Sequence, residues 1–392
     1  MMPVIKSLDT ANMEITKAGE KRLRSLSETD TKICKVAKSI LSREEALPVI
    51  QNMYCKATWR KPQAISVADL TEKRFLLRKS DSDPPLMLQG YFSNKMIAQG
   101  GESQLYPVVS KEGQGYFFST SRHSQPYSPI PEISRIVGKN AFSCAYVPES
   151  LQTGVESKAD FRFQLVEHAS EGDLRNFLRR QNLSIRDNNA LPDLGLQLLE
   201  KVKVLHDHGG AHRDIKPANL LVDTNKEKLE LFIGDFGMYT TEKAKCGRCG
   251  TVGYRGPEAS EFFKFFDREF KNHDDYVPKN YDPKRLDLYA IGATLFEILT
   301  KGSLATAITK WLDETKTMTE ATRCYSKNDF SLFRQQKIVS FLDDCIYKAS
   351  ESSWMKVPEF AEVIKGLIQE EPENRIPLEK AISLWKKGLQ RL

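Results

Sequence analysis

Several polar residues that can perform chemistry lie close together in the stretch AHRDIKPANLLV, residues 211–222. Asp214 lies two residues before Lys216 and five residues before Asn219. A carboxylate beside an acceptor hydroxyl, an ammonium group beside a phosphate and an oxygen ligand for Mg²⁺ supply the positioning and charge neutralisation that phosphoryl transfer needs. The alternative is a polar turn between a helix and a strand, and only the flanking residues can decide between the two.

Four further motifs follow in a fixed order. GDFG places Asp235 twenty-one residues after Asp214, and GTVGYRGPE ends at Glu258. DLYAIG then places Asp287 at the start of an apolar segment that is expected to be a buried helix. PENRI supplies Arg375, the expected ion-pair partner of Glu258. Each motif alone is weak, but the ordered set favours a catalytic origin for the first stretch.

In this order the motifs resemble those of the eukaryotic-type Ser/Thr protein kinase family, over about residues 94–392. The resemblance implies that Asp214 is the catalytic base and that Asn219 and Asp235 are the Mg²⁺ ligands. It implies that Lys216 contacts phosphate and that ATP is the phosphate donor. Protein substrates with Ser or Thr acceptors are the expected partners, because Lys216 and a Thr before the P-E segment look like the Ser/Thr subtype.

The resemblance also locates a hinge in FQLVEHASEGDL, residues 163–174. Val166 would be the gatekeeper, and Glu167 and Ala169 would present backbone groups to adenine. Asp173 would reach the ribose. The alternative for these residues is an ordinary strand end followed by a polar helix cap.

The glycine-rich loop that should cover the phosphates departs from the family pattern. Its best match is IAQGGESQLY, in which Gly100 and Gly101 are present, Ala98 replaces the first glycine and Ser103 the last. Fewer glycines allow fewer backbone N–H groups to approach the phosphates closely. A second candidate, EGQGYF, leaves too little chain before the hinge for a helix and two strands, so we predict that it is a hairpin turn.

The lysine expected at the end of the next strand is also missing. That strand is GYFFSTSR, where Thr120 or Arg122 occupies the region, and arginine is not equivalent to lysine as a phosphate contact. RIVGK, which ends at Lys139, resembles the expected motif but lies too near the hinge. Glu132 is the carboxylate of the following helical stretch that is expected to pair with the cation.

The activation segment differs in a way that bears on regulation. Arg213 precedes the predicted base, which in this family usually implies neutralisation by a phosphorylated residue. Between Thr241 and Thr251 the sequence EKAKCGRCG contains no hydroxyl group, although Thr240 and the two flanking threonines remain. Glu242 is a candidate source of the negative charge. We therefore predict activity without an upstream kinase.

The same segment contains CGRC, which brings Cys246 and Cys249 to a CxxC spacing. Lys245 and Arg248 can lower a thiol pKa, so a redox switch is one interpretation. A zinc site needs two more ligands, which the sequence does not identify. Two ordinary thiols are the third interpretation.

Composition indicates an ordinary globular chain. The 392 residues are 40% hydrophobic and 28% charged, and the net charge is +6. Seven scattered cysteines do not form a disulfide framework, so free thiols in a reducing compartment are expected. The N-terminus lacks the apolar segment of a secretory signal peptide, and no apolar run reaches the length of a membrane helix. We therefore expect no transmembrane segment, no nucleic-acid partner and a cytoplasmic location.

Periodicity divides the chain into three regions. Residues 1–90 are predicted to be a helical extension, with a boundary at KSDSDPPLML, and they hold 16 basic against 11 acidic residues. Residues 91–170 contain five short β-like runs and one helical stretch, PEISRIVGKN, and would form the small lobe. Residues 171–392 are mainly helical and would form the large lobe. A regulatory partner is expected on the extension or on the phenylalanine-rich insert at 259–286.

The sequence thus predicts an α+β, bilobal protein-kinase fold with an N-terminal helical extension. The predicted function is Mg²⁺-dependent transfer of the ATP γ-phosphate to Ser or Thr hydroxyls of proteins. Because the lysine is missing and the glycine loop is incomplete, a pseudokinase scaffold remains an alternative. A kinase-fold enzyme with a different nucleotide-dependent transfer is a third. The divergent small lobe also resembles bacterial effector kinases, which would act in the host cytoplasm.

Overall fold

The structure is a computed structural model of the whole chain. It describes residues 40–57, 64–79, 84, 86–99, 103–121, 131–147, 163–180, 190–226, 228–241, 249–259, 282–314, 335–349 and 353–392. The chain divides into two compact units, Met1–Ser42 and Arg43–Leu392, and all of the elements described below belong to the second.

The described strands are, in chain order, β1 (Leu70–Arg78), β2 (Leu86–Ser93), β3 (Ala98–Gln99), β4 (Ser103–Ser110), β5 (Gly115–Ser121), β6 (Ala141–Val147), β7 (Phe163–Glu167), β8 (Gly172–Asp173), β9 (Leu220–Asn225) and β10 (Lys228–Ile233). The described α-helices are α2 (Arg43–Ala57), α3 (Ser134–Val137), α4 (Leu174–Arg180), α5 (Ala190–Asp207), α7 (Pro283–Thr300), α8 (Leu304–Glu314), α10 (Gln335–Lys348), α11 (Pro358–Leu367) and α12 (Leu378–Leu389).

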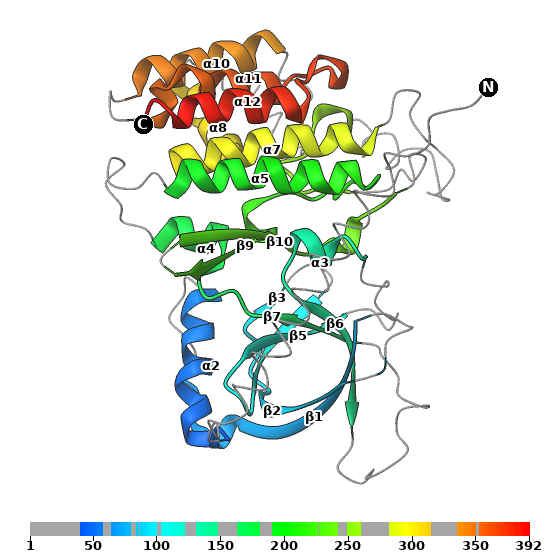
Figure 1. Cartoon of the computed structure of the whole chain (residues 1–392). Helices are drawn as coiled ribbons and strands as arrows, with labels where there is room; N and C mark the ends of the chain where they lie inside the picture. Colours follow the sequence, from blue (N-terminus) through cyan, green and yellow to red (C-terminus); the bar gives the residue numbers. More distant parts are fainter. Residues whose placement is uncertain are drawn as a thin grey trace, which may run out of the picture. The chain divides into compact units, whose positions relative to one another are not determined.

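Six of these strands close into an antiparallel barrel (Figure 1). The strand order is β2–β1–β6–β7–β5–β4, and β2 pairs in turn with β4, where Tyr91 lies opposite Val109. Inward-facing side chains from all six strands fill the barrel, because alternate residues of a strand point to one face. The buried members of this core are Phe75, Leu77, Val108, Phe118, Phe142, Cys144 and Leu165.

The β-like runs predicted between residues 94 and 170 are confirmed as β3 to β7. The predicted hairpin turn is also confirmed, because β4 and β5 are joined through residues 111–114, with Gly113 at a φ of 90°. The helical stretch between the third and fourth runs is a single turn, α3. Ile133 and Val137 at the two ends of this turn are buried in the core formed by the helices of the C-terminal part.

The predicted helical extension over residues 1–90 differs from the structure. Helix α2 begins at Arg43, but η1 (Val67–Asp69) and β1 follow it, and the double-proline stretch leads into β2. The prolines therefore connect two strands of one barrel and do not separate two domains. The reason is that β1 pairs with β6, about seventy residues later, and a pairing of that range leaves no periodic trace in the local sequence. Residues 1–39 lie outside the described residues.

Helix α2 packs on the outside of the barrel. Its apolar face consists of Ala46, Ile50, Met53 and Tyr54, all buried. Met53 lies against Gly115 at the start of β5, where a Cβ atom would approach its sulfur to 3.2 Å. The helix is therefore part of the same folded unit as the strands.

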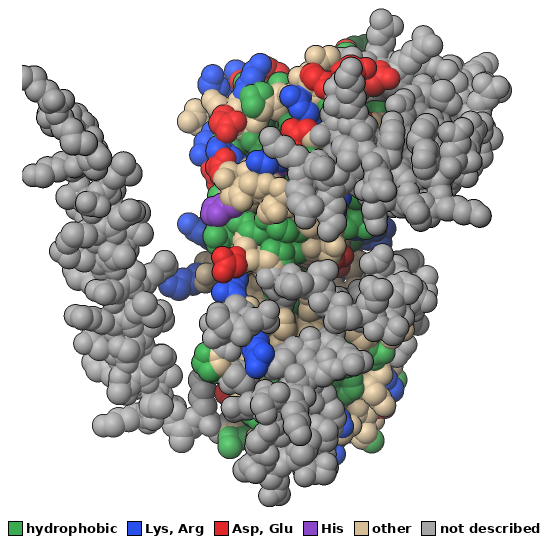
Figure 2. Space-filling view, turned by 90° about the vertical axis from the view of Figure 1, so that its right-hand side faces the viewer, with side chains coloured by type: hydrophobic (Ala, Val, Ile, Leu, Met, Phe, Trp, Pro, Cys, Tyr) green, Lys and Arg blue, Asp and Glu red, His purple; other side chains and the backbone are tan. Residues whose placement is uncertain are grey.

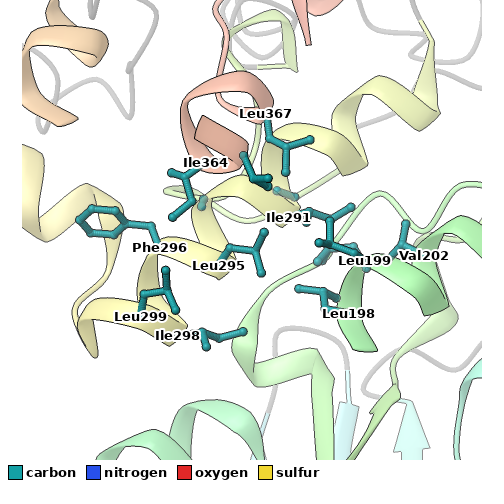
Figure 3. Packing of buried hydrophobic residues seen from close by; sticks show 14 of the residues in the cluster. Leu198, Leu199, Val202, Ile291, Leu295, Phe296, Ile298, Leu299, Ile364 and Leu367 are labelled. Atoms are coloured by element: carbon teal, nitrogen blue, oxygen red, sulfur yellow. The ribbon is translucent and has the colours of Figure 1, made fainter. Parts of the chain in front are cut away.

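The C-terminal part is built on helices α5 and α7, which pack on each other and on α11 and α12 (Figure 1). Both predicted helices, at 191–209 and 286–299, are confirmed. Figure 3 shows how their side chains point into one cluster with α11; the labelled residues are Leu198, Leu199, Val202, Ile291, Leu295, Phe296, Ile298, Leu299, Ile364 and Leu367. Strands β8, β9 and β10 form a second, three-stranded sheet beside α5.

The described surface carries charges of both signs. On the face drawn in Figure 2, basic and acidic side chains are interspersed. The ion pair Lys386–Glu200 joins α12 to α5 at 2.8 Å, and Lys203 pairs with Asp207 one turn further along α5 at 2.7 Å. Among the helices that the structure describes, none combines the length and the apolar character needed to cross a membrane.

Candidate active site

The predicted catalytic residues come together in the loop between α5 and β9. The Asp214 carboxylate is buried, and its Oδ2 accepts hydrogen bonds from Lys216 Nζ at 2.7 Å and from Asn219 Nδ2 at 3.0 Å. Asn219 Nδ2 also donates to the backbone oxygen of Asp214 at 2.9 Å. Asn219 is the last residue of the turn η3 (Pro217–Asn219), which begins with a proline that fixes the backbone before β9.

A threonine from the activation segment completes this cluster. Thr251 Oγ1 donates to Asp214 Oδ1 at 2.7 Å and accepts from Lys216 Nζ at 2.6 Å. The three side chains therefore form a closed triangle of hydrogen bonds. The triangle holds the activation segment against the catalytic loop, and it leaves the carboxylate in contact with both an ammonium group and a hydroxyl group.

The predicted catalytic loop is anchored by Asp287, near the start of α7. This carboxylate is completely buried, and it accepts hydrogen bonds from the backbone N–H groups of His212 at 2.8 Å and Arg213 at 2.7 Å. His206 Nε2 lies 2.9 Å from the same carboxylate. Charge-assisted bonds of this kind are stronger than neutral ones, so Asp287 fixes the backbone that precedes the predicted base.

Two neighbouring residues show how tightly that backbone is held. Arg213 has a φ of 66°, a conformation that is rare outside glycine, and its Nε donates to the backbone oxygen of Met238 at 2.6 Å. His212 Nδ1 accepts from Asp214 N at 3.3 Å, and its Nε2 lies 3.0 Å from the oxygen of Gly234. This pattern requires a neutral imidazole protonated on Nε2.

The GDFG motif lies next to the catalytic loop. Gly234 N donates to Asn219 O at 2.7 Å, which brings the two predicted metal ligands onto adjoining segments. Asp235 is exposed, has a φ of 55° and accepts at Oδ1 from Gly237 N at 3.3 Å. The turn η4 (Phe236–Met238) follows, and the Phe236 ring packs edge-on against His212 at 5.3 Å.

These two side chains fit a magnesium ion. Both N–H groups of the Asn219 amide can be used by its two bonds to Asp214, so the amide oxygen is the atom left to face a cation. Asp235 adds an exposed carboxylate. Mg²⁺ prefers hard oxygen ligands and is usually held by one or two protein side chains together with substrate phosphates. The donor set therefore matches the predicted metal.

The predicted hinge residues lie at the end of β7. The backbone N–H of Glu167 donates to Asn140 O at 2.8 Å, and its carboxylate accepts from Asn140 Nδ2 at 2.8 Å. Ala169 is buried, and its carbonyl accepts from Gly172 N at 2.9 Å. Hydrogen bonds on both sides thus fix the course of the hinge backbone.

Asp173 has the cap role that the sequence left as the alternative to a ribose contact. Its Oδ1 accepts from the backbone N–H of Asn176 at 2.9 Å, and its Oδ2 accepts from Asn176 Nδ2 at 2.6 Å. Burial raises the pKa of Asp173 above its ordinary value, while the bonds from Asn176 oppose that shift. Each carboxylate oxygen keeps a second lone pair, so the cap does not prevent a further hydrogen bond from a ligand.

The predicted phosphate-binding cation is not located by the described residues. Phe117 and Ser119 of β5 lie opposite Val166 and Gln164 of β7, so these four side chains share the outer face of the barrel. Neither of the two β5 residues is basic. Arg122, Gly100 and Gly101 lie outside the described residues.

Lys139 has an acidic partner on β9, outside the cluster around Asp214. Lys139 Nζ forms an ion pair with Asp223 of β9 at 2.5 Å, which supports its exclusion from the phosphate contacts. Burial alone raises the pKa of Asp223, but hydrogen bonds from Lys139 and Ser170 outweigh it and hold the pKa below its ordinary value. Glu132 precedes α3, and its side chain is exposed.

Two further predictions for the activation segment can be compared with the structure. The ion pair between Glu258 and Arg375 is confirmed. Cys249 is buried with Ala259 and Leu286 in a small apolar cluster, which favours an ordinary structural thiol at this position. Cys246 and residues 260–281 of the phenylalanine-rich insert at 259–286 lie outside the described residues.

Sequence reasoning placed Asp287 on its helix but missed its role as the anchor of the catalytic loop. It also missed Asn176, whose amide joins Asp173 to helix α2. The position of an aspartate at the start of a buried helix was the only signal for the first. For the second, the Asp-x-x-Asn spacing at the start of a helix is a capping pattern that could have been noticed.

Comparison with known proteins agrees with this geometry. The family model of the protein kinase domain matches residues 150–384, which is more than half of the chain. The interferon-induced, double-stranded RNA-activated protein kinase of Mus musculus is 28% identical over 52% of this chain and 38% of its own length. The serine/threonine-protein kinase cds1 of Schizosaccharomyces pombe is 34% identical over 36% of this chain and 28% of its own.

The mitogen-activated protein kinase p38a of Drosophila melanogaster is also similar, with 31% identity over 36% of this chain and 32% of its own length. The chain thus spans about a third of the length of the curated relatives it matches. The matched family region includes the catalytic loop, GDFG and the P-E segment, and it begins after β6.

Proposed function

Because this chain belongs to the protein kinase family, we propose that it is a Ser/Thr protein kinase that uses ATP and Mg²⁺. The observation that carries the proposal is the hydrogen-bonded triangle of Asp214, Lys216 and Thr251. The same triangle supports the Ser/Thr subtype, since its lysine and threonine are the two residues on which that prediction was based. The kinase cds1 of Schizosaccharomyces pombe, to which this chain is similar, carries the same subtype in its name.

In the proposed reaction, Asp214 orients the acceptor hydroxyl and accepts its proton. Lys216 neutralises charge on the transferred phosphoryl group, because its ammonium group is held next to that carboxylate. Asn219 and Asp235 would hold Mg²⁺, which when bound neutralises charge on the phosphate oxygens. The hydrogen bonds that the backbone N–H groups of His212 and Arg213 donate to Asp287 keep the loop in place before substrate arrives, so little reorganisation is needed.

The proposed nucleotide site lies along the hinge. Backbone groups of Glu167 and Ala169 would bind adenine, and Asp173 would bind the ribose. Gly100 and Gly101 would lie over the phosphates. Arg122, or another cation, would take the place of the missing lysine, with Glu132 as its proposed partner.

A second candidate function is favoured by one observation. The two β5 residues on the outer face next to Val166 and Gln164 are Phe117 and Ser119, so the described part of this strand offers no cation to the nucleotide. A kinase-fold scaffold that binds partners without transferring phosphate accounts for this substitution. The retention of Asp214, Asn219 and Asp235 together weighs against it, because a scaffold has no chemical need for all three.

The deciding experiment is phosphate transfer from labelled ATP with Mg²⁺, comparing wild type, Asp214→Ala, Asp235→Ala and the control Asp343→Ala. Asp343 is a largely exposed residue of α10, paired with Lys365. We expect label on a generic protein acceptor or on the enzyme itself, retained in the control and lost in both active-site variants. The assay is repeated with small-molecule acceptors. If the wild type binds nucleotide but no protein is labelled, the result would favour another transfer reaction. Absence of both would favour the scaffold.

Protein substrates are the proposed partners, and a regulatory partner is proposed for residues 1–90 or the insert at 259–286. A cytoplasmic location stays a prediction, as does delivery into a host cell. Fractionation of the producing cell and of any infected host cell, with an antibody against the chain, is the measurement that tests both.

A further inference from the structure

The C-terminal end of helix α2 is tied to the start of the helical region at three points. Lys56 Nζ forms an ion pair with Glu171 at 2.7 Å. Arg180 Nη1 donates to the backbone oxygen of Lys56 at 2.6 Å, and Asn176 Nδ2 donates to that of Ala57 at 2.8 Å. The last carbonyls of a helix have no partner within the helix, so α4 supplies donors that α2 itself lacks.

The fit between α2 and the chain after the hinge leaves little space. Gly172 has a φ of 73°, and a Cβ atom at this position would lie 2.8 Å from Lys56 O. One turn earlier on the same helix, the Met53 sulfur lies against Gly115, where a Cβ atom would approach it to 3.2 Å. Helix α2 therefore contacts both the barrel and the segment that follows β7. The helix therefore passes directly beside the predicted hinge.

Asn176 connects this helix to the predicted ribose-binding carboxylate. Its Nδ2 donates to Asp173 Oδ2 at 2.6 Å as well as to Ala57 O. Both neighbours are acceptors, so the NH₂ group is the only end of the amide that fits there. One amide proton is available for each bond. The side chain is therefore satisfied only when α2 and Asp173 are both in their present positions.

We propose that Asn176 is a positioning residue that couples helix α2 to the nucleotide site, by holding Asp173 in the orientation that binds the ribose hydroxyls. The coupling rests on the proposed function, because it assumes that ATP binds along the hinge. Loss of the Asn176 side chain leaves Asp173 Oδ2 without this donor, so the carboxylate is held only through Oδ1 by the backbone N–H of residue 176. Loss of the α2 contact leaves the amide held by Asp173 alone. Helix α2, outside the matched family region, is thereby a component of the nucleotide site.

The test measures the dissociation constants of ATP and of 2′,3′-dideoxy-ATP for the full chain. It compares wild type, Asn176→Ala, Lys56→Ala and the matched control Asn374→Ala, whose side chain is exposed in η7 (Pro372–Asn374). Wild type should bind ATP about tenfold more tightly than the dideoxy analogue, since hydrogen bonds to a charged group contribute strongly. The control should keep that ratio.

In Asn176→Ala the ratio should fall to about two, through weaker ATP binding, while the affinity for the analogue stays nearly constant. KM for ATP should rise in Asn176→Ala, whereas kcat at saturating ATP should stay within about twofold of the wild-type value. Lys56→Ala should give an intermediate ratio of about five, because its ion pair is partly exposed. A purely structural role for Asn176 would lower the active fraction and apparent kcat but leave the ratio unchanged.

An unchanged ratio in Asn176→Ala, or a wild type that does not distinguish the two nucleotides, would overturn the coupling. Phosphate transfer measured on the same wild-type sample separates this outcome from a failure of the proposed function. If wild type transfers phosphate and the ratio does not respond, only the coupling is wrong. If wild type neither binds ATP nor transfers phosphate, the proposed function is wrong as well.

Discussion

Glu258 and Arg375 meet as a bidentate pair, with both carboxylate oxygens accepting from the guanidinium at 2.6 and 2.7 Å. The Arg375 side chain is fully buried and lies over the ring of Tyr289 at 5.2 Å. Its Nε also donates to the backbone oxygen of Gln369 at 3.0 Å. A planar, forked donor is therefore needed here, and the pair fixes the end of the activation segment to the C-terminal helices.

Replacing this arginine with lysine should be costly although the charge is kept. We expect Arg375→Lys to lower the free energy of unfolding by about 3 kcal/mol, because a lysine cannot restore the bidentate geometry and leaves buried acceptors unpaired. Urea unfolding measures the loss. Arg391→Lys, whose side chain is 61% exposed in its pair with Glu359, should cost less than about 0.5 kcal/mol. Equal losses in the two variants would contradict the explanation.

Asp287→Asn should reduce catalysis by releasing the catalytic loop. The amide keeps the shape of the side chain, but it has only one acceptor oxygen for the N–H groups of His212 and Arg213. We expect kcat to fall at least about tenfold, with a much smaller change in KM for ATP. Steady-state kinetics checks this, with Asp343→Asn as the exposed control. A kcat equal to that of the control would show that the loop does not need this anchor.

His168 should make the protein less stable in mild acid. Burial lowers its pKa from 6.5 to about 4, and among the described residues its buried Nε2 has no hydrogen-bond partner. The unfolded chain therefore takes up a proton between pH 6.5 and 4 that the folded chain does not, so stability falls as pH falls through this window. The charged groups around the ring are Asp223, Lys139, Lys56 and Glu171.

The measurement is urea unfolding of wild type and His168→Phe from pH 7.5 to pH 4. The variant should gain stability relative to wild type as the pH falls through that window, by at most about 3 kcal/mol. His208→Phe, at an exposed position, controls for the loss of a histidine. A difference in the free energy of unfolding between wild type and variant that does not change with pH would contradict the prediction.

The activation segment should not require phosphorylation by a second kinase. Thr240 is buried and exchanges backbone hydrogen bonds with Ala211, and the Thr251 hydroxyl is held by Asp214 and Lys216. We expect Thr241→Ala, at an exposed position, to retain activity within about twofold. Thr251→Val should lose activity. Transfer assays on phosphatase-treated protein check this, and an enzyme inert until treated with another kinase would refute it.

Cysteine reactivity should follow burial. Cys55 is exposed on α2, whereas Cys144 lies inside the barrel and Cys249 in the small cluster beneath the activation segment. Burial raises the pKa of Cys144, which further disfavours its thiolate. With iodoacetamide and mass spectrometry, Cys55 should be labelled first and the other two only in denaturant. Labelling of Cys249 as fast as Cys55 in the native protein would revive the redox interpretation.

The sequence was informative where one local pattern determines structure. The apolar periods of α5 and α7 predicted those helices, and alternation and turn residues predicted β3 to β7. Arg375 could be paired with Glu258 because both belong to motifs with fixed roles. Asp214, Lys216 and Asn219 are brought together by a spacing of five residues, so their juxtaposition required little from the rest of the fold.

The parts that could not be predicted depend on distant contacts. In β1, four consecutive polar residues precede Phe75, Leu76 and Leu77, so neither a strand period nor a helix period is visible. Leu76 faces away from the barrel interior and is nevertheless buried, which breaks the alternation of a half-buried strand. The local sequence around Asn176 likewise indicates only a capping residue. Its bond to α2 depends on a segment more than a hundred residues earlier in the chain.

Closure of the barrel also sets the order of events during synthesis. Strand β1 cannot complete its pairings until β6 has been made, and the ring is not closed until β7 follows at Phe163–Glu167. Synthesis adds about 5–20 residues per second, so several seconds pass between the synthesis of β1 and that of β6. During this time the edge of β1 that pairs with β6 has no partner strand. Helix α2 waits longer still, for α4. This chain should consequently fold slowly and depend on chaperones during translation. The reason is that the entropy cost of closing a long loop arises before the long-range strand contacts can stabilise the fold.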